Sequence, residues 1–232
     1  MITVRRSSDR GHFDHGWLDT YHTFSFGAYR DPEQMGFSAL RVINEDWVAP
    51  GMGFGEHPHR DMEIITYVLE GALEHRDSIG NGSILRAGMF QRMSAGTGFR
   101  HSEFNASDRD PVHLYQIWIH PATDGLTPSY EELTAPKAPT DNEWLLIAGP
   151  EGAPGTMTIH QDAALYSGMI SPGSSLSYSL RPGRHAWIQV VRGTVRVLGE
   201  ALNASDGAAV SDELELLFES ADGAEVLLFD LP

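Results

Sequence analysis

Short β-branched and aromatic runs closed by glycine or proline constrain the fold of this 232-residue chain more than any other feature. Residues 63–70 read EIITYVLE and are followed by Gly71, and residues 111–121 read PVHLYQIWIHP. Such runs are typical of β-strands, and IGNGS at 79–83 carries the Asn-Gly signature of a tight hairpin turn. Residues 1–55 show no sustained apolar pattern at 3.6-residue spacing. Strands at this close, regular spacing predict an all-β barrel or sandwich.

Residues 121–143 divide the chain. This stretch, PATDGLTPSYEELTAPKAPTDNE, is rich in proline, threonine and charge and is typical of a linker, within which SYEEL predicts one or two turns of helix. We therefore expect two domains, residues 1–130 and residues 131–232, the second of which begins with the linker. Neither half indicates more than a few short helices.

The second half repeats the first in outline. VLEGALEH at 68–75 is similar to VVRGTVRV at 190–197, and VHLYQIWIHP at 112–121 is similar to EVLLFDLP at 225–232. A repeat of this kind predicts two copies of one β-unit.

The acidic, cysteine-free composition limits the function. With 16 Lys+Arg against 32 Asp+Glu the formal net charge is −16, which disfavours a nucleic-acid partner. Since the chain has no cysteine, a metal would need nitrogen and oxygen ligands. No apolar run reaches the length of a membrane span, and no secretory signal follows the N-terminus, so we expect a cytoplasmic protein with no membrane partner.

Two stretches repeat histidine and carboxylate at a two-residue interval, GEHPHRDME at 55–63 and RHSEFN at 100–105. In extended strands alternate side chains share a face. The expected stripes are His57, His59, Asp61 and Glu63 on one strand, and His101 and Glu103 on the other. Paired across a barrel interior, they would offer three imidazoles and up to two carboxylates, a set suited to Fe, Mn, Cu, Ni or Zn.

The second stripe makes a metal site a stronger hypothesis than one His-x-His pair would. A single pair is more often surface or hydrogen-bonded histidine. The second pair is independent and follows the small-residue run SAGTG at 94–98, which suits close backbone approach. The matching part of the second half, SYSLRPGRHAWIQ, has no such pair, so we expect one site, in the first domain.

Other histidines and the large apolar residues have simpler interpretations. We expect hydrogen-bonded or exposed imidazoles at His12, His15, His22, His75 and His113. The apolar residues are expected in the core, with some of them lining a pocket above the metal as the alternative. The set considered for this pocket is Phe26, Phe37, Phe54 and Met93.

These stretches resemble a known family. GMGFGEHPHRDME at 51–63 is similar to the first cupin motif, a glycine, five residues, His-x-His, three residues and glutamate, and GTGFRHSEFN at 96–105 is similar to the second. Gly71 comes one residue later than usual, and Gly96 stands where cupins often have proline. HGWLDTYHTFSFGAY, FSALRVINEDWVAPG and QRMSAGTGFRHSEFN resemble the pirin family, above all its bacterial quercetinase-like members.

The resemblance implies two tandem cupin (jelly-roll) β-barrels packed together, with one divalent transition metal in the N-terminal barrel. Iron is the expected metal, with Ni, Mn, Cu, Zn and Co as alternatives. The residues that match the family's ligands are His57, His59, His101 and Glu103. The residue matching Glu63 lies near the metal without binding it.

The resemblance also implies an oxidoreductase of the quercetin 2,3-dioxygenase type, which opens the heterocyclic ring of a flavonol with O2 and releases carbon monoxide. Glu103 is then the expected catalytic base and Glu63 the alternative base, acting on a small aromatic substrate. The alternative function is that of a metal- and redox-dependent regulatory protein that acts by contact with another protein. A third hypothesis is a hydrolase or an isomerase built on the same barrel, because a fold does not fix a function.

Overall fold

The computed structural model describes residues 1–134, 142–150 and 155–232, and β-strands dominate it. Within these ranges the single helical element is the 3-10 turn η1 (Ser7–Asp9). The chain forms two units. The N-terminal unit comprises Gly11–Thr134 with residues 155–161, and the C-terminal unit comprises Met1–Arg10, residues 142–150 and Asp162–Pro232. The predicted all-β class is confirmed, and no helix in the described ranges is long and apolar enough to span a membrane.

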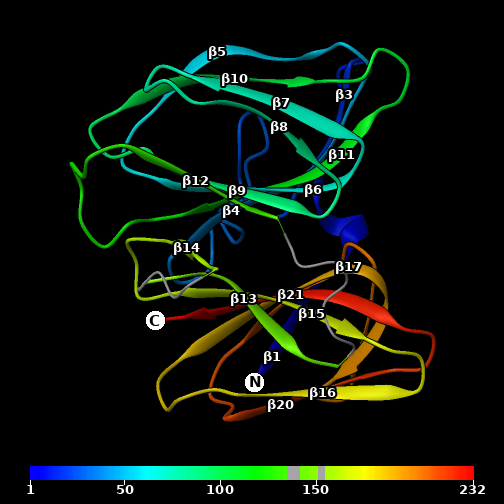
Figure 1. Cartoon of the computed structure of the whole chain (residues 1–232). Helices are drawn as coiled ribbons and strands as arrows, with labels where there is room; N and C mark the ends of the chain where they lie inside the picture. Colours follow the sequence, from blue (N-terminus) through cyan, green and yellow to red (C-terminus); the bar gives the residue numbers. More distant parts are fainter. Residues whose placement is uncertain (135–141, 151–154) are drawn as a thin grey trace. The chain divides into compact units, whose positions relative to one another are not determined.

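Two sheets face each other in the N-terminal unit (Figure 1). The smaller sheet has the strand order β5-β10-β7-β8, and the larger has the order β12-β9-β6-β11-β4-β3-β2. The strands are β2 (Gly11–Asp14), β3 (Leu18–His22), β4 (Leu40–Val48), β5 (Gly53–His59), β6 (Glu63–Glu70), β7 (Ala72–Asp77), β8 (Gly82–Arg86), β9 (Met89–Ser94), β10 (Phe99–Asn105), β11 (Val112–Ile119) and β12 (Ser129–Thr134). The predicted hairpin turn at 79–83 joins β7 to β8.

The C-terminal unit has a similar plan. Its main sheet contains the order β1-β19-β17-β21-β15-β13, while β16 pairs with β20 and β18 pairs with the end of β17. The strands are β1 (Ile2–Arg5), β13 (Trp144–Gly149), β15 (Ala164–Ile170), β16 (Ser174–Ser179), β17 (His185–Val197), β18 (Glu200–Asn203), β19 (Gly207–Val210), β20 (Glu215–Ser220) and β21 (Ala224–Leu231). Strand β1 pairs with β19, so the first residues of the chain belong to this unit. The short β14 (Met157–Thr158) lies in the N-terminal unit.

Glycines at matching positions confirm the predicted repeat. Gly71 has φ +79° and Gly193 has φ +75°, and a Cβ at either would overlap a backbone carbonyl. The carbonyl belongs to Pro111 in one unit and Gly223 in the other, each the residue just before the last long strand, β11 or β21. The same close crossing therefore requires glycine in both units.

The stretch 121–143 is not a plain linker. Residues 129–133, predicted to form one or two helical turns, instead lie in β12, which pairs antiparallel with β9 from Ser129↔Ser94 onward. Long-range pairing with the edge of the larger sheet overrides the weak local helical preference. Residues 135–141 lie outside the described residues. The domain boundary at 130/131 stays a prediction. Strand β1, which precedes this boundary, lies in the C-terminal unit, and β14, which follows it, lies in the N-terminal unit.

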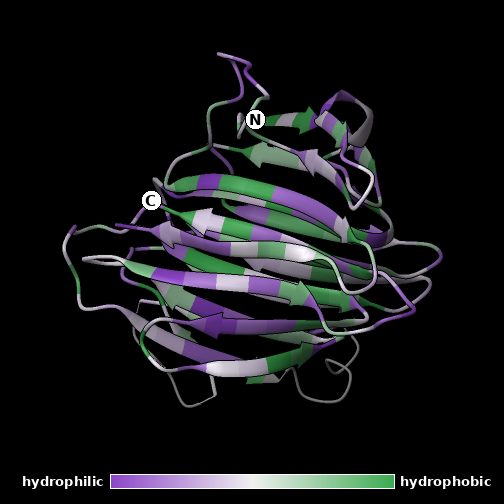
Figure 2. Ribbon diagram, turned by 90° about the horizontal axis from the view of Figure 1, so that it is seen from above, coloured by the Kyte–Doolittle hydropathy of each residue, from purple (hydrophilic) through white to green (hydrophobic). Residues whose placement is uncertain are grey.

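Apolar side chains fill much of the interior of each unit. Figure 2 shows hydrophobic and hydrophilic residues alternating along the strands, as expected when one face of a strand is buried. One cluster in the N-terminal unit contains Leu18, Val48, Val68, Leu73, Leu85, Val112 and Leu114. The middle of the same interior is polar, and it contains the candidate site.

Candidate metal centre

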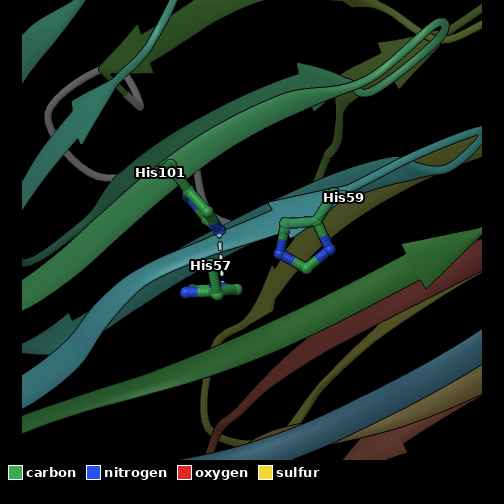
Figure 3. Close-up of side chains that lie close together, drawn as sticks. All are labelled: His57, His59 and His101. Atoms are coloured by element: carbon green, nitrogen blue, oxygen red, sulfur yellow. Dashed lines mark hydrogen bonds between the residues drawn. The ribbon is translucent and has the colours of Figure 1, made fainter.

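Three imidazoles from two neighbouring strands meet inside the N-terminal unit. His57 and His59 lie on β5 and His101 lies on β10, with His101 directly opposite His57 in the antiparallel register. Figure 3 shows the three rings turned toward one another. One ligand atom from each ring lies within 4.8 Å of the others. We call His57, His59 and His101 the imidazole cluster.

A β-bulge in β5 brings an aromatic residue to the same face. His101 pairs with His57, but Glu103, two residues further, pairs with Phe54, three residues back. The extra residue in β5 shifts the alternation, so Phe54 and His57 both line one cavity. Simple alternation would have placed Gly55 there instead.

The tautomers of the cluster suit a cation. His57 Nδ1 lies 2.8 Å from the Gly55 carbonyl, which can only accept, so Nδ1 carries the proton and Nε2 has the lone pair. This Nε2 lies 2.9 Å from His101 Nε2. His101 Nδ1 is buried and has no hydrogen-bond partner among the described residues. The Nε2 atoms of His57 and His101 therefore point toward the same position. A bound cation would take the place of the proton that these two nitrogens share in the metal-free protein.

Burial keeps two of the three rings neutral. Desolvation is the main cause that lowers the pKa of His59 to about 3, and the neighbouring His101 and His57 lower it further. Desolvation is also the main cause that lowers the pKa of His101 to about 3, with smaller contributions from His57 and His75. Both rings therefore offer lone pairs at neutral pH, and they fit a divalent transition metal that takes imidazole ligands.

Glu103 lies in a second group that shares His101. The ligand atoms of His75, His101 and Glu103 lie within 4.8 Å of one another, and all three residues are buried. Glu103 also lines the same cavity as His57 and His59. The four predicted ligands thus come from β5 and β10, but Glu103 is grouped with His75 rather than with the two β5 histidines.

Two amides hold the Glu103 carboxylate. Gln91 Nε2 donates to Oε1 at 2.8 Å, and Gln116 Nε2 donates to Oε2 at 3.1 Å. Gln91 Nε2 also donates to the Thr66 hydroxyl at 3.0 Å, so both partners of this nitrogen are acceptors and the orientation of the amide is fixed. The Thr66 hydroxyl also donates to Oε1 at 3.4 Å, whereas Oε2 accepts from Gln116 alone among the described residues. Glu103 is therefore held in place, and Oε2 keeps a lone pair that can bind a cation.

Asp61 and Glu63 do not continue the stripe. Strand β5 ends at His59, and Asp61 has φ +46° in the turn that leads to β6, so the expected alternation over 57–63 is wrong beyond His59. Asp61 Oδ1 accepts from the backbone of Gly125. Glu63 is buried, and its two oxygens bind Ser94 at 2.7 Å and His160 Nδ1 at 3.0 Å. Among the described residues, neither carboxylate joins a ligand group.

A cavity of about 400 Å³ opens beside the imidazole cluster. Of the four residues predicted to form a pocket, Phe26 and Phe54 line it, together with Trp118. Phe37 and Met93 do not line it. Met93 is buried in a core cluster with Ile64, Ala95 and Phe99, and Phe37 forms a β-bridge with Leu40. Apolar character alone could not tell a wall residue from a core residue.

Several residues of the site were not singled out from the sequence. His75, expected to be hydrogen-bonded or exposed, is fully buried, bonds to Asp77 at 3.3 Å and stacks on Tyr130. Asp46, Gln91 and Gln116 also face this interior. The feature that brings His75 to the site is the register of β7 against β10, which places His75 directly opposite Glu103. Of the other histidines, His113 bonds to Glu45 at 3.0 Å, as expected for a satisfied imidazole.

Asp46 gives the metal-free protein a pH-dependent stability. Desolvation is the main cause that raises its pKa from 3.8 to about 7, with Glu103, Glu45 and Asp19 adding to it. The folded state therefore holds this proton more tightly than the unfolded state, and stability is lost as pH rises through 7. Relative to Asp46→Asn, which can still accept from Thr20, wild type should lose about 2 kcal/mol of unfolding free energy between about pH 5.5 and about pH 8. Urea unfolding of chelator-treated proteins measures this difference, and parallel pH profiles of the two proteins would contradict it.

Gly96 in the SAGTG turn is required by the backbone that crosses it. It has φ +45°, and a Cβ would overlap the Leu126 carbonyl. Gly96→Ala should cost about 3 kcal/mol of unfolding free energy from steric overlap and left-handed backbone together. Gly125→Ala is the control, because Gly125 has φ +74° with open space around it, and only the backbone term of about 1 kcal/mol applies. Equal losses in the two variants by urea unfolding would show that Leu126 imposes no constraint.

Family models match both halves of the chain. The model described as Pirin matches residues 3–119, and the model described as the quercetinase C-terminal cupin domain matches residues 146–231.

Full-length relatives and a solved structure are also similar. The quercetin 2,3-dioxygenase of Escherichia coli K12 is 49% identical over 232 residues, covering 100% of this chain and 99% of that protein. A pirin-like protein of Caulobacter vibrioides is 40% identical over 231 residues, covering 99% of each. The crystal structure of the bacterial pirin YhhW from E. coli in complex with nickel(II) superposes with a TM-score of 0.96 at 49% identity, covering 100% of this chain and 99% of that one.

Proposed function

The chain belongs to the pirin family of two-cupin proteins, and from this premise we propose that it is a metal-dependent dioxygenase that opens the heterocyclic ring of quercetin-type flavonols with O2. The observation that carries the proposal is the imidazole cluster at the wall of an aromatic-lined cavity. The name of the E. coli relative supports the same reaction class.

His57, His59, His101 and Glu103 are the proposed ligands of one divalent transition metal. Iron is the proposed metal, and the nickel(II) complex of the related E. coli structure supports a transition metal of this group. When bound, such an ion would act as a Lewis acid that lowers the pKa of the flavonol 3-hydroxyl and orients the ring. His75 lies close to both His101 and Glu103, so its ring would limit the space beside these two ligands.

Glu103 is the proposed base for the 3-hydroxyl proton. Its carboxylate borders the cavity, and the two amides of Gln91 and Gln116 keep it oriented toward that space. Glu63 is a poorer base, because Ser94 and His160 occupy its oxygens and it does not border the cavity. We therefore assign Glu63 a structural role.

The cavity walls suit a flat aromatic substrate. Phe26 and Trp118 pack edge to face with ring centroids 5.3 Å apart. Phe54 lies on β5, the strand that also carries His57, and the centroids of these two rings are 6.4 Å apart. Aromatic walls of this kind bind planar rings and exclude water from the reacting oxygen. A volume of about 400 Å³ lies within the usual range of small-molecule sites.

The test is metal-dependent loss of quercetin. Protein loaded in turn with Fe, Mn, Ni, Cu or Co is mixed with quercetin in air, and the visible absorbance of the flavonol is followed. We expect at least one metal to support turnover well above that of the similarly treated His59→Ala variant. Equal rates in the two proteins with every metal would refute the proposal.

A further inference from the structure

One wall of the cavity is polar but does not belong to the imidazole cluster. This wall comes from β3 and β4 of the larger sheet, whereas the imidazole cluster comes from the smaller sheet. Its side chains are Thr20, His22, Asn44 and Asp46. We call these four residues the β3–β4 wall. The cavity thus has two chemically different polar surfaces.

Asp46 is the residue of this wall whose burial most destabilises the fold. It is 4% exposed, and its carboxyl group accepts a single hydrogen bond among the described residues, from the cross-strand Thr20 hydroxyl at 2.5 Å. No arginine pairs with it within the described ranges, and the charged groups that act on it are the carboxylates of Glu103, Glu45 and Asp19. A buried carboxyl without a cation destabilises the fold, so packing does not explain its presence.

Asn44, a second residue of this wall, has a buried polar atom that accepts no hydrogen bond within the described part of the chain. Asn44 lies two residues before Asp46 on the same face of β4 and is 3% exposed. Its Oδ1 atom is buried and has no hydrogen-bond partner in the described part of the chain. Buried polar groups that the protein leaves unsatisfied beside a ligand-sized cavity are typical of a binding site.

A hydroxyl group fits this wall better than other substrate groups. A hydroxyl both donates and accepts, so it matches a carboxyl in either protonation state and an amide in either orientation. The space between this wall and the imidazole cluster is lined by the rings of Phe26, Phe54 and Trp118. An aromatic ring held there would place its outer hydroxyls against the polar wall.

We propose that Asp46, assisted by Asn44, binds a second hydroxyl of the substrate, one that takes no part in the ring opening, and so selects polyhydroxylated aromatic substrates. This inference rests on the proposed dioxygenase function. It assigns Asp46 to substrate recognition and leaves the proton transfer to Glu103.

The test compares two flavonols that differ in their outer hydroxyls. Quercetin carries several, whereas 3-hydroxyflavone carries just the hydroxyl that would go to the metal. Binding is measured by fluorescence titration of the purified protein under nitrogen, which prevents turnover. Asp46→Ala should weaken quercetin binding about ten-fold, the value of one lost hydrogen bond, and change 3-hydroxyflavone binding less than about two-fold.

Two further variants separate recognition from disruption. Asp46→Asn keeps a donor and an acceptor and should retain quercetin affinity within about three-fold of wild type. Asp19→Asn removes a nearby carboxylate that is half exposed and bonds to His12, and it should change neither affinity. Metal content of each variant, measured alongside, should equal that of wild type.

The outcomes distinguish this inference from the proposed function. Equal weakening of both flavonols in Asp46→Ala, or no weakening of quercetin, would overturn the hydroxyl subsite. Selective weakening of quercetin in a protein that does not consume it would uphold the subsite and refute the dioxygenase. Failure of wild type to bind quercetin would overturn both.

Discussion

Replacing His59 by alanine is expected to reduce the bound transition metal from near one ion per chain to below about a tenth, because the proposed site of three imidazoles and one carboxylate loses one of its four ligands. His59 is partly exposed to the cavity, and its ring lies with centroid distances of 4.8 Å from both His57 and His101. Elemental analysis of protein purified without added metal measures the change.

The matched control for this variant is His120→Ala. His120 is exposed, and the hydrogen bonds recorded for it, to Ala39 and from Gln161, use its backbone atoms. This variant should keep the wild-type metal content. Wild-type metal content in His59→Ala, or no transition metal in wild type, would contradict the assignment of the imidazole cluster.

Exchanging Glu103 for glutamine is expected to lower quercetin turnover at least about 100-fold, since the variant loses both a ligand charge and the proposed proton acceptor. The amide nearly matches the carboxylate in shape, so the interior should remain packed. Steady-state rates of the metal-loaded protein at saturating quercetin measure this effect.

Glu63→Gln is the matched control, because Glu63 is an equally buried carboxylate of the same interior. It should keep turnover within about two-fold of wild type but lose about 1–3 kcal/mol of unfolding free energy, since Ser94 and His160 lose their charged acceptor. A loss of turnover in Glu63→Gln equal to that in Glu103→Gln would make Glu63 part of the reaction after all.

The fold was largely predictable because its signals are local or repeated. Alternating β-branched runs and glycine turns predicted strands such as β6 and β11, and the repeat correctly paired Gly71 with Gly193. Strand β12 was missed because its stability comes from pairing with β9, a contact between residues far apart in the sequence.

The candidate site was predictable only where strand alternation holds. His57, His59 and His101 meet as the alternation of β5 and β10 predicts. The prediction failed at Asp61, where the chain turns, and it could not foresee the bulge that brings Phe54 to the cavity.

Residues that reach the site from other strands carried no motif of their own. Gln91, Gln116 and Asp46 are ordinary polar residues in the sequence, and they become part of the site through the register of β9, β11 and β4. A buried polar residue in an otherwise apolar strand is the signal that could have drawn attention to them.

Carbon monoxide released by the metal-loaded protein during quercetin consumption in air tests the central claim most directly. Ring opening by a dioxygenase of this type should give carbon monoxide equimolar with the quercetin lost, and His59→Ala should give none above the metal-free background. Quercetin loss without carbon monoxide, or equal release from the variant, would contradict a flavonol dioxygenase at this site.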